Sequence, residues 1–71
     1  MTKKEIITRI EAGQIMKEWF GTKSNTHEIG GERVTSKQFK AALDHFGDKL
    51  DFTADYSGFT KHYYKIKDIY R

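Results

Sequence analysis

The sequence contains no cysteine, no proline and no long apolar run. Because cysteine is absent, no disulfide bond can stabilise the fold, and an intracellular protein is more natural than a secreted one. No stretch approaches the ~20 apolar residues that a transmembrane helix needs. The opening stretch, MTKKEIITRI, lacks the hydrophobic segment of a signal peptide. We therefore expect a cytoplasmic protein that does not span a membrane.

Charge is only weakly biased toward the positive sign. The chain has 13 Lys and Arg residues against 10 Asp and Glu residues, a formal net charge of +3. This small basic excess permits binding to nucleic acid without requiring it. With 71 residues, the chain has room for a single small globular domain, 1–71, in which one core is marginally stabilising. Aromatic residues make up 14% of the chain, so we expect some in the core and others available to a partner.

The clearest local signal is a helix that begins after Thr35. Thr35 is a good N-cap, and Gln38 three residues later completes a capping box. Gly47 then ends the helix, because glycine accepts the backbone conformation that follows a helix. The apolar residues between these signals have the spacing of one buried stripe: Phe39, Ala42, Leu43 and Phe46.

A second helix is predicted near the start of the chain by the same signals. Thr2 is its cap, Glu5 closes a capping box, and Gly13 ends the helix. Its apolar face consists of Ile6, Ile7 and Ile10. The residues that follow, 14–20, read as a strand, but their poor alternation leaves a short helix nearly as well supported. Trp19 and Phe20 within this segment are expected to be buried.

Two hairpins are predicted from turn residues. Gly30-Gly31 fits a two-residue primed turn, which sets Glu28 opposite Arg33 as a charge pair. The segment 49–68 predicts another hairpin, in which a two-residue loop would mix apolar residues and lysines on one face. A three-residue loop, 56–58, with Gly58 at positive φ shifts the register by one and separates them. The face that results is apolar and aromatic: Leu50, Phe52, Ala54, His62, Tyr64 and Ile66.

Together these elements predict an α+β fold, with two capped helices packed on a small antiparallel sheet of β-hairpins. The segments TKKEIITRIEAG and TSKQFKAALDHFG share a faint pattern. That similarity favours an α-β-β-α-β-β order, although two well-capped helices resemble each other without any duplication.

Motifs for catalysis are missing from the sequence. His27, His45 and His62 lack the close spacing of a zinc motif, and the glycines form no phosphate-binding loop. The serines are explained by a loop, a helix start and a turn. We therefore expect no enzyme activity, no metal ion and no cofactor.

The first candidate binding site is the beginning of the helix after Thr35. A helix N-terminus with positive side chains suits phosphate groups or base edges. The residues are Arg33, Ser36, Lys37 and Lys40. A following hairpin would suit a winged helix, but a Gly-Gly hairpin occupies the place of the supporting helix. Solvated lysines on a surface helix explain the same pattern.

The second candidate site is the outward face of the last hairpin, where lysines alternate with aromatic rings. Such a face can stack on bases while its lysines contact phosphates. It consists of Phe59, Lys61, Tyr63, Lys65 and Lys67. Exposed rings also suit a protein interface, for which the sequence offers Trp19, Phe59 and Tyr63. Cross-strand pairing of these lysines with Asp51 and Asp55 is the structural alternative.

The sequence therefore predicts a small binding module without enzyme activity. Its compactness, basic excess and lack of catalytic groups are similar to those of small accessory proteins of phages and mobile elements. A nucleic-acid-binding accessory protein is the first hypothesis. A protein-binding accessory or inhibitor protein, which uses the aromatic hairpin surface, is the second. The chain is expected to act as a monomer or a homodimer.

Overall fold

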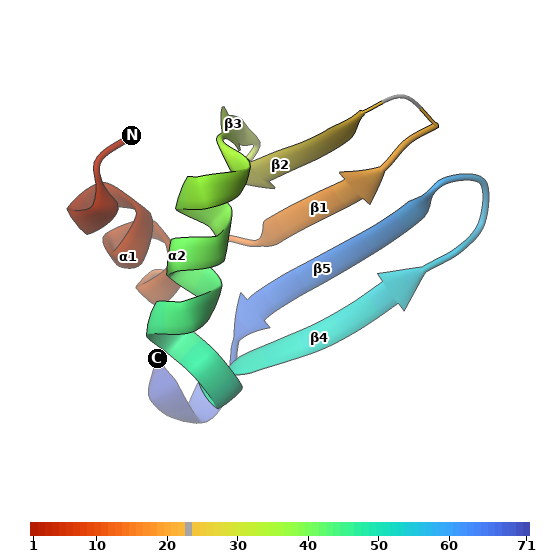
Figure 1. Ribbon diagram of the computed structural model, residues 1–71. Coiled ribbons are helices and arrows are strands. Elements are labelled where there is room, and N and C mark those ends of the chain that lie inside the picture. The colour runs from red at the N-terminus through yellow and green to blue at the C-terminus, as the bar shows by residue number, and fades with distance from the viewer. Residues whose placement is uncertain (23) are drawn as a thin grey trace.

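The computed structural model describes residues 1–22 and 24–71 and shows two helices on one face of a five-stranded antiparallel sheet (Figure 1). The strand order is β3-β2-β1-β5-β4, so β1 and β5 lie side by side in the centre. This arrangement confirms the predicted α+β fold. The elements are α1 (Lys3–Glu11), β1 (Met16–Phe20), β2 (Asn25–Ile29), β3 (Glu32–Val34), α2 (Ser36–Phe46), η1 (Gly47–Lys49), β4 (Leu50–Asp55), β5 (Thr60–Ile66) and η2 (Asp68–Tyr70).

Both helices begin at the predicted caps. The hydroxyl oxygen of Thr35 accepts a hydrogen bond from the N–H of Gln38, and the Gln38 side chain accepts one from the N–H of Thr35. This is the complete capping box that the sequence predicts. In α1 the hydroxyl oxygen of Thr2 accepts from the N–H of Glu5, but the Thr2 hydroxyl donates to the Glu5 carboxylate. The Thr2 cap is therefore confirmed, whereas its capping box forms only in part.

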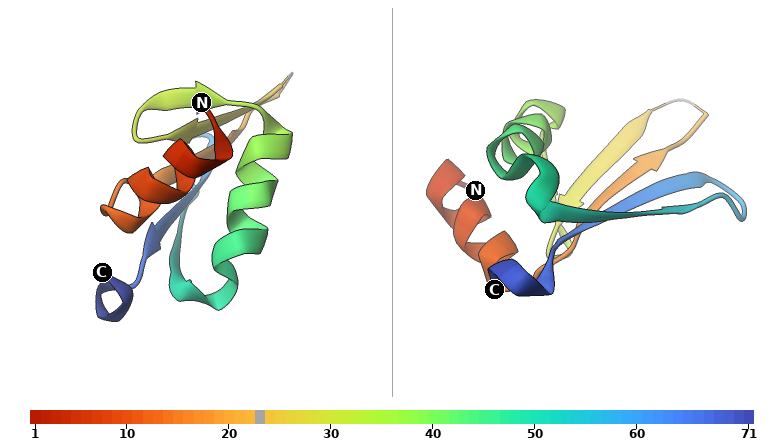
Figure 2. Two further views of the ribbon diagram at one scale, coloured as in Figure 1. Left: turned by 90° about the vertical axis from the view of Figure 1, so that its left-hand side faces the viewer. Right: turned by 90° about the horizontal axis from the view of Figure 1, so that it is seen from below.

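The core lies between the helices and one face of the sheet. α1 and α2 pack against each other and against β2, and α1 also contacts β5 (Figure 2). The buried core residues are Ile6, Ile10, Met16, Ile29, Phe39, Ala42, Phe46 and Ile66. Trp19 and Phe20 are only half-buried and lie outside this core. Their predicted burial is therefore wrong, because Trp19 faces away from the helices and Phe20 lies at the end of β1 that extends beyond them.

The structure decides between the strand and the short helix that the sequence left open for residues 14–20. Residues 16–20 form a strand, β1, which pairs with β2. At the β2–β3 turn, Gly30 and Gly31 have φ of 60° and 84°, and Glu28 stands opposite Arg33, as predicted. The strand β3 completes the predicted Gly30-Gly31 hairpin, so three strands lie between the two helices.

The second hairpin keeps its predicted faces but has a longer loop. The last cross-strand pair is Asp55 with Lys61, and residues 56–59 connect the two strands, so the predicted three-residue loop is wrong. The register differs from the prediction by two residues, which preserves the faces because the side-chain period of a strand is two. The Asp55 carboxylate accepts hydrogen bonds from the N–H and hydroxyl of Ser57, which starts the turn early. Gly58 has the expected positive φ, at 90°.

The hairpins β1–β2 and β4–β5 extend well beyond the helices (Figure 2). The helices cover the sheet where β4 begins and β5 ends, and they leave the opposite ends of these hairpins bare on both faces. The face of the sheet away from the helices is open along its whole length; we call it the open face. In the part of the chain that the structure describes, no helix is long and apolar enough to cross a membrane.

Candidate nucleic-acid interface

The two central strands present lysines and aromatic rings on the open face. Met16 points into the core, so the alternation of β1 turns Lys17 and Trp19 to the other side of the sheet. Lys17 stands opposite Tyr63, and Trp19 stands opposite Lys61. A cation therefore neighbours a ring both along each strand and across the pair. With the next outward residue of β5, the set comprises Lys17, Trp19, Lys61, Tyr63 and Lys65, and we call it the central stripe.

Trp19 is contacted by two ammonium groups of this stripe. The Nζ atom of Lys17 lies 4.8 Å from the centroid of the Trp19 ring, and the Nζ atom of Lys61 lies 5.0 Å from it. Both distances are within the range of cation–π attraction. The Nε1 atom of Trp19 is buried and finds no hydrogen-bond acceptor among the residues described. The free protein thus holds two cations against one half-buried ring.

Carboxylates flank the central stripe on both sides. On β2, Glu28 faces the same side, and its carboxylate lies 3.9 Å from Nζ of Lys17. On β4, Asp51 and Asp55 stand opposite Lys65 and Lys61. The two hydrogen bonds from Ser57 and, to a smaller extent, the charge of Lys61 hold the pKa of Asp55 below its ordinary value. The open face is thus positive along its centre, and the strand on each side of the centre carries carboxylates.

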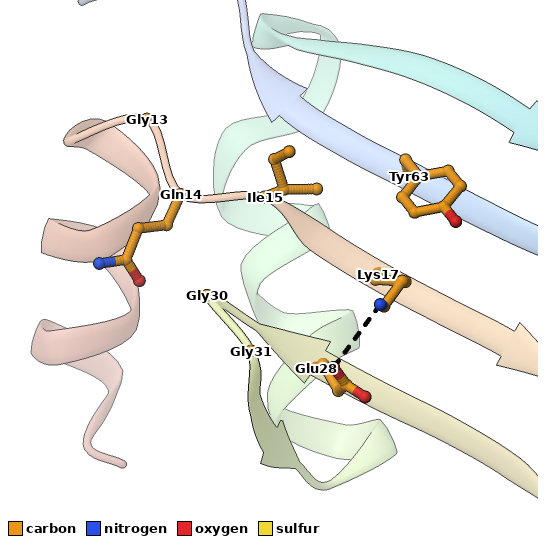
Figure 3. A pocket seen from close by; sticks show the side chains of 8 residues that line it. All are labelled: Gly13, Gln14, Ile15, Lys17, Glu28, Gly30, Gly31 and Tyr63. Atoms are coloured by element: carbon orange, nitrogen blue, oxygen red, sulfur yellow. Dashed lines mark ion pairs between the residues drawn. The ribbon is translucent and has the colours of Figure 1, made fainter.

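Two shallow hollows lie at the end of the stripe where β1 begins. The first has a volume of about 520 Å³ and lies between the Gly13-Gln14 and Gly30-Gly31 turns (Figure 3). The second, also of about 520 Å³, lies over β4 and β5. Both are lined by Ile15 and Tyr63, and Ile15 is 48% exposed. The two side chains therefore offer apolar surface at the border between the hollows, where a planar group could be held.

The predicted nucleic-acid site is divided between two sides of the molecule. Lys61, Tyr63 and Lys65 lie on the open face, and Arg33 faces the same side from the edge strand β3. The helix α2 packs on the opposite face of the sheet. Its exposed residues Ser36, Lys37 and Lys40 therefore do not join the stripe in one basic surface.

The remaining predicted residues have separate positions. Phe59 lies in the loop at the tip of the β4–β5 hairpin, outside the strand, and is 56% exposed. Lys67 follows β5, just before η2. Of the three predicted protein-interface residues, Trp19 and Tyr63 both lie on the open face, whereas Phe59 does not lie with them.

Sequence reasoning missed Lys17. It lies two positions before Trp19, so a strand would place both side chains on one face. That signal was present in the sequence, but it could be used only once 14–20 was assigned to a strand. Even then, the neighbourhood of Lys17 and Tyr63 depends on the pairing of β1 with β5, which joins segments far apart in the sequence.

A second polar cluster, also missed, lies on the helix side of the sheet. The carboxylate of Glu18 lies 3.0 Å from Nε2 of His27 and 3.6 Å from Nδ1 of His62. The rings of Phe20 and Phe52 pack edge-on against the imidazole of His62, at centroid distances of 4.9 and 5.0 Å. Among the residues described, no group of three or more His, Asp or Glu side chains is arranged to hold a metal ion. We interpret the cluster as structural, because Glu18 supplies a polar partner to the imidazole of His27, which packs against the buried ring of Phe39 at a centroid distance of 5.0 Å.

Comparison of the chain with protein-family models, with curated proteins and with solved structures gave no match.

Proposed function

We propose that this protein is a nucleic-acid-binding module that holds single-stranded DNA or RNA on its open face. The observation that carries the proposal is the central stripe itself, in which all five outward side chains of two neighbouring strands are lysine or aromatic. Aromatic rings on a sheet stack on unpaired bases, and nearby lysines neutralise the phosphates. The open face favours a single strand, because reading a duplex requires an element that enters a groove.

The contacts of Trp19 supply a physical route for binding. In the free protein the ammonium groups of Lys17 and Lys61 lie against the ring. Both lysine stems are flexible, so the ammonium groups can move to phosphate oxygens while a base takes their place on the ring. The flanking carboxylates of Glu28, Asp51 and Asp55 oppose a polyanion at the margins. They favour one strand that runs along the stripe over a ligand that covers the whole sheet.

Titration with fluorescent single-stranded and double-stranded oligonucleotides over a range of salt concentrations tests the proposal. We expect tighter binding to the single strand and an affinity that falls as salt rises. Lys61→Gln and Lys65→Gln should each reduce the slope of log affinity against log salt by about 0.7, the value for one lost phosphate contact on a single strand. Lys40→Gln is the matched control, because it makes the same change in charge on the opposite side of the sheet.

One outcome would place the binding site elsewhere on the molecule, and another would rule out the nucleic-acid function. If Lys37→Glu and Lys40→Glu abolish binding while Lys61→Gln does not, the site is the beginning of α2. If neither oligonucleotide binds in a salt-sensitive manner, the nucleic-acid function is wrong.

The second candidate function is binding of a protein partner. The carboxylates that flank the stripe and the exposed side chain of Ile15 favour it, because mixed charges around apolar and aromatic groups are typical of protein interfaces. In that case Tyr63→Ala or Trp19→Ala should abolish binding of the partner, and the affinity of the wild-type protein for the partner should depend little on salt. Recovery of the partner after nuclease treatment of a cell extract, and its loss with the Tyr63→Ala variant, would support this function.

A further inference from the structure

We infer that two copies of this chain associate edge to edge through β4, in antiparallel orientation and with Phe52 on the two-fold axis. β4 is an edge strand of the sheet. Edge strands carry unpaired backbone groups that can bind another strand. The inference is independent of the proposed function, because it uses the edge of the sheet and not the open face.

The hydrogen-bond pattern fixes which residues of β4 offer free backbone groups. The N–H of Lys67 donates to the carbonyl oxygen of Lys49 at 2.9 Å, one position before the pair Leu50–Ile66. In an antiparallel pair, positions bonded to the neighbour alternate with positions whose N–H and C=O point away. Asp51, Thr53 and Asp55 therefore bond to β5. The groups that point to the free edge belong to Leu50, Phe52 and Ala54.

Charge selects one register among the three that overlap most of β4, whose two-fold axes lie at Asp51, Phe52 and Thr53. With Phe52 opposite itself, Leu50 stands opposite Ala54 of the second copy, and Asp51 opposite its Thr53. Lys49 then stands opposite Asp55, twice in the dimer. A shift of the two-fold axis to Asp51 would oppose two Asp51 carboxylates, and a shift to Thr53 would oppose Asp51 and Asp55. Like charges directly opposite each other are destabilising, so the register centred on Phe52 is favoured.

Exposed apolar side chains support the same edge. Six large hydrophobic residues in the described part of the chain are exposed, and five of them lie on β4 or at its two ends. Phe52, 54% exposed, lies in the middle of the strand. Tyr56 and Phe59 lie in the loop beyond its end, and Ile69 and Tyr70 lie near its start, where Nζ of Lys49 is 5.5 Å from the Tyr70 ring centroid.

The antiparallel register brings these apolar groups together. Because Asp55 of one copy stands opposite Lys49 of the other, the hairpin tip with Tyr56 lies beside Tyr70 of the second copy, at both ends of the contact. Figure 2 shows that one end of the β4–β5 hairpin is bare and that the helices cover the other end. In this register the bare end of each hairpin therefore lies beside the helix-covered end of the other copy, which keeps the two helix layers apart. The same surface of each copy thus forms the two sides of the contact, which are related by a two-fold axis, as in most homodimers.

Single-cysteine variants test this register, because the natural chain has no cysteine. Residues that bond directly across an antiparallel pair have Cα atoms about 5.5 Å apart, within the range of a disulfide. Under mild oxidation, Phe52→Cys should therefore cross-link with itself. Leu50→Cys and Ala54→Cys should each stay largely monomeric alone and cross-link when the two are mixed. Equal cross-linking of all three variants alone would overturn the register.

Sedimentation of the uncross-linked protein tests the association itself. We expect a reversible dimer with a dissociation constant below about 1 mM. Ala54→Pro should abolish it without unfolding the chain, because the N–H that proline removes points to the free edge and the substitution removes no aromatic ring. Lys49→Glu should weaken it about tenfold through two repulsive pairs, whereas Lys40→Glu on α2 should not. A wild-type chain that stays monomeric at about 1 mM, with or without an oligonucleotide, would overturn the inference.

Discussion

The ammonium nitrogen of Lys61 lies 5.0 Å from the centroid of the Trp19 ring, and the two residues face each other across the central strands β5 and β1. A second lysine, Lys17, approaches the same ring from two positions earlier on β1, at 4.8 Å. The ring is thereby kept half-buried on a face that both helices leave open. Substitution of Trp19 therefore tests the contribution of base stacking to the proposed binding separately from the contribution of charge.

Trp19→Ala should weaken binding to single-stranded oligonucleotides by about 1–3 kcal/mol, the range for loss of one base–ring stack. The slope of log affinity against log salt should stay unchanged, because stacking releases no counterions. Quenching of the fluorescence of Trp19, the single tryptophan, should follow binding in the wild-type protein. If a folded Trp19→Ala variant kept full affinity, the Trp19 ring would not be part of the binding site.

Glu18→Ala should destabilise the fold by about 1–3 kcal/mol, because it leaves a polar ring nitrogen of His27 without its partner in a half-buried position. Chemical denaturation of the variant and the wild type measures the difference. Glu11→Ala, at an exposed position at the end of α1, is the control and should change stability by less than about 0.5 kcal/mol. Equal stability of the two variants would show that the cluster around Glu18 contributes nothing.

Tyr64 should make stability fall with rising pH in the alkaline range. Burial and, to a smaller extent, the charge of Glu18 raise the pKa of Tyr64 above its ordinary value of 10.0. Between the ordinary and the raised pKa, the unfolded chain loses this proton while the folded chain keeps it. The contribution is therefore fully present below pH 10 and is lost above it. Tyr64→Phe should show a shallower loss of stability above about pH 10, and identical pH profiles would contradict the shift.

Gly58→Ala should destabilise the β4–β5 hairpin by about 1 kcal/mol. Gly58 has φ of 90°, and an added Cβ would meet no described atom within 4 Å, so the expected loss comes from the backbone alone. Gly58→Asn should lose less, because asparagine tolerates positive φ better than alanine. Thermal melts measure both variants, and an unchanged midpoint for Gly58→Ala would mean that the loop adopts another conformation.

Thr35→Ala should reduce stability by about 1 kcal/mol, because it removes the side-chain acceptor for the N–H of Gln38 at the start of α2. The loss should be visible as a lower midpoint in a denaturant titration. Thr35→Ser retains a hydroxyl at the cap and should restore most of the difference. A Thr35→Ala protein as stable as the wild type would show that other contacts hold the first turn of α2.

Local signals determined much of this fold. The cap of α2 lies three residues from the group that it bonds, and the turn at Gly30-Gly31 depends on two adjacent positive φ angles. The polarity of β4 and β5 also identified their faces, because strands alternate with a period of two. Such features are set by residues close together in the chain, and the sequence is sufficient to predict them. The loop length escaped prediction because a displacement of two residues leaves every face unchanged.

Only the tertiary structure decided which surfaces these elements share. Nothing within residues 14–20 reveals that β1 will pair with β5, which brings Lys17 beside Tyr63 and Trp19 beside Lys61. Nor do the lysines of α2 and β5 reveal that the sheet will separate them, since that depends on which face the helices cover. Strand order and helix placement follow from burial of one small core assembled from distant segments. The candidate site is therefore a property of the packing, whereas its lysines and rings are properties of the sequence.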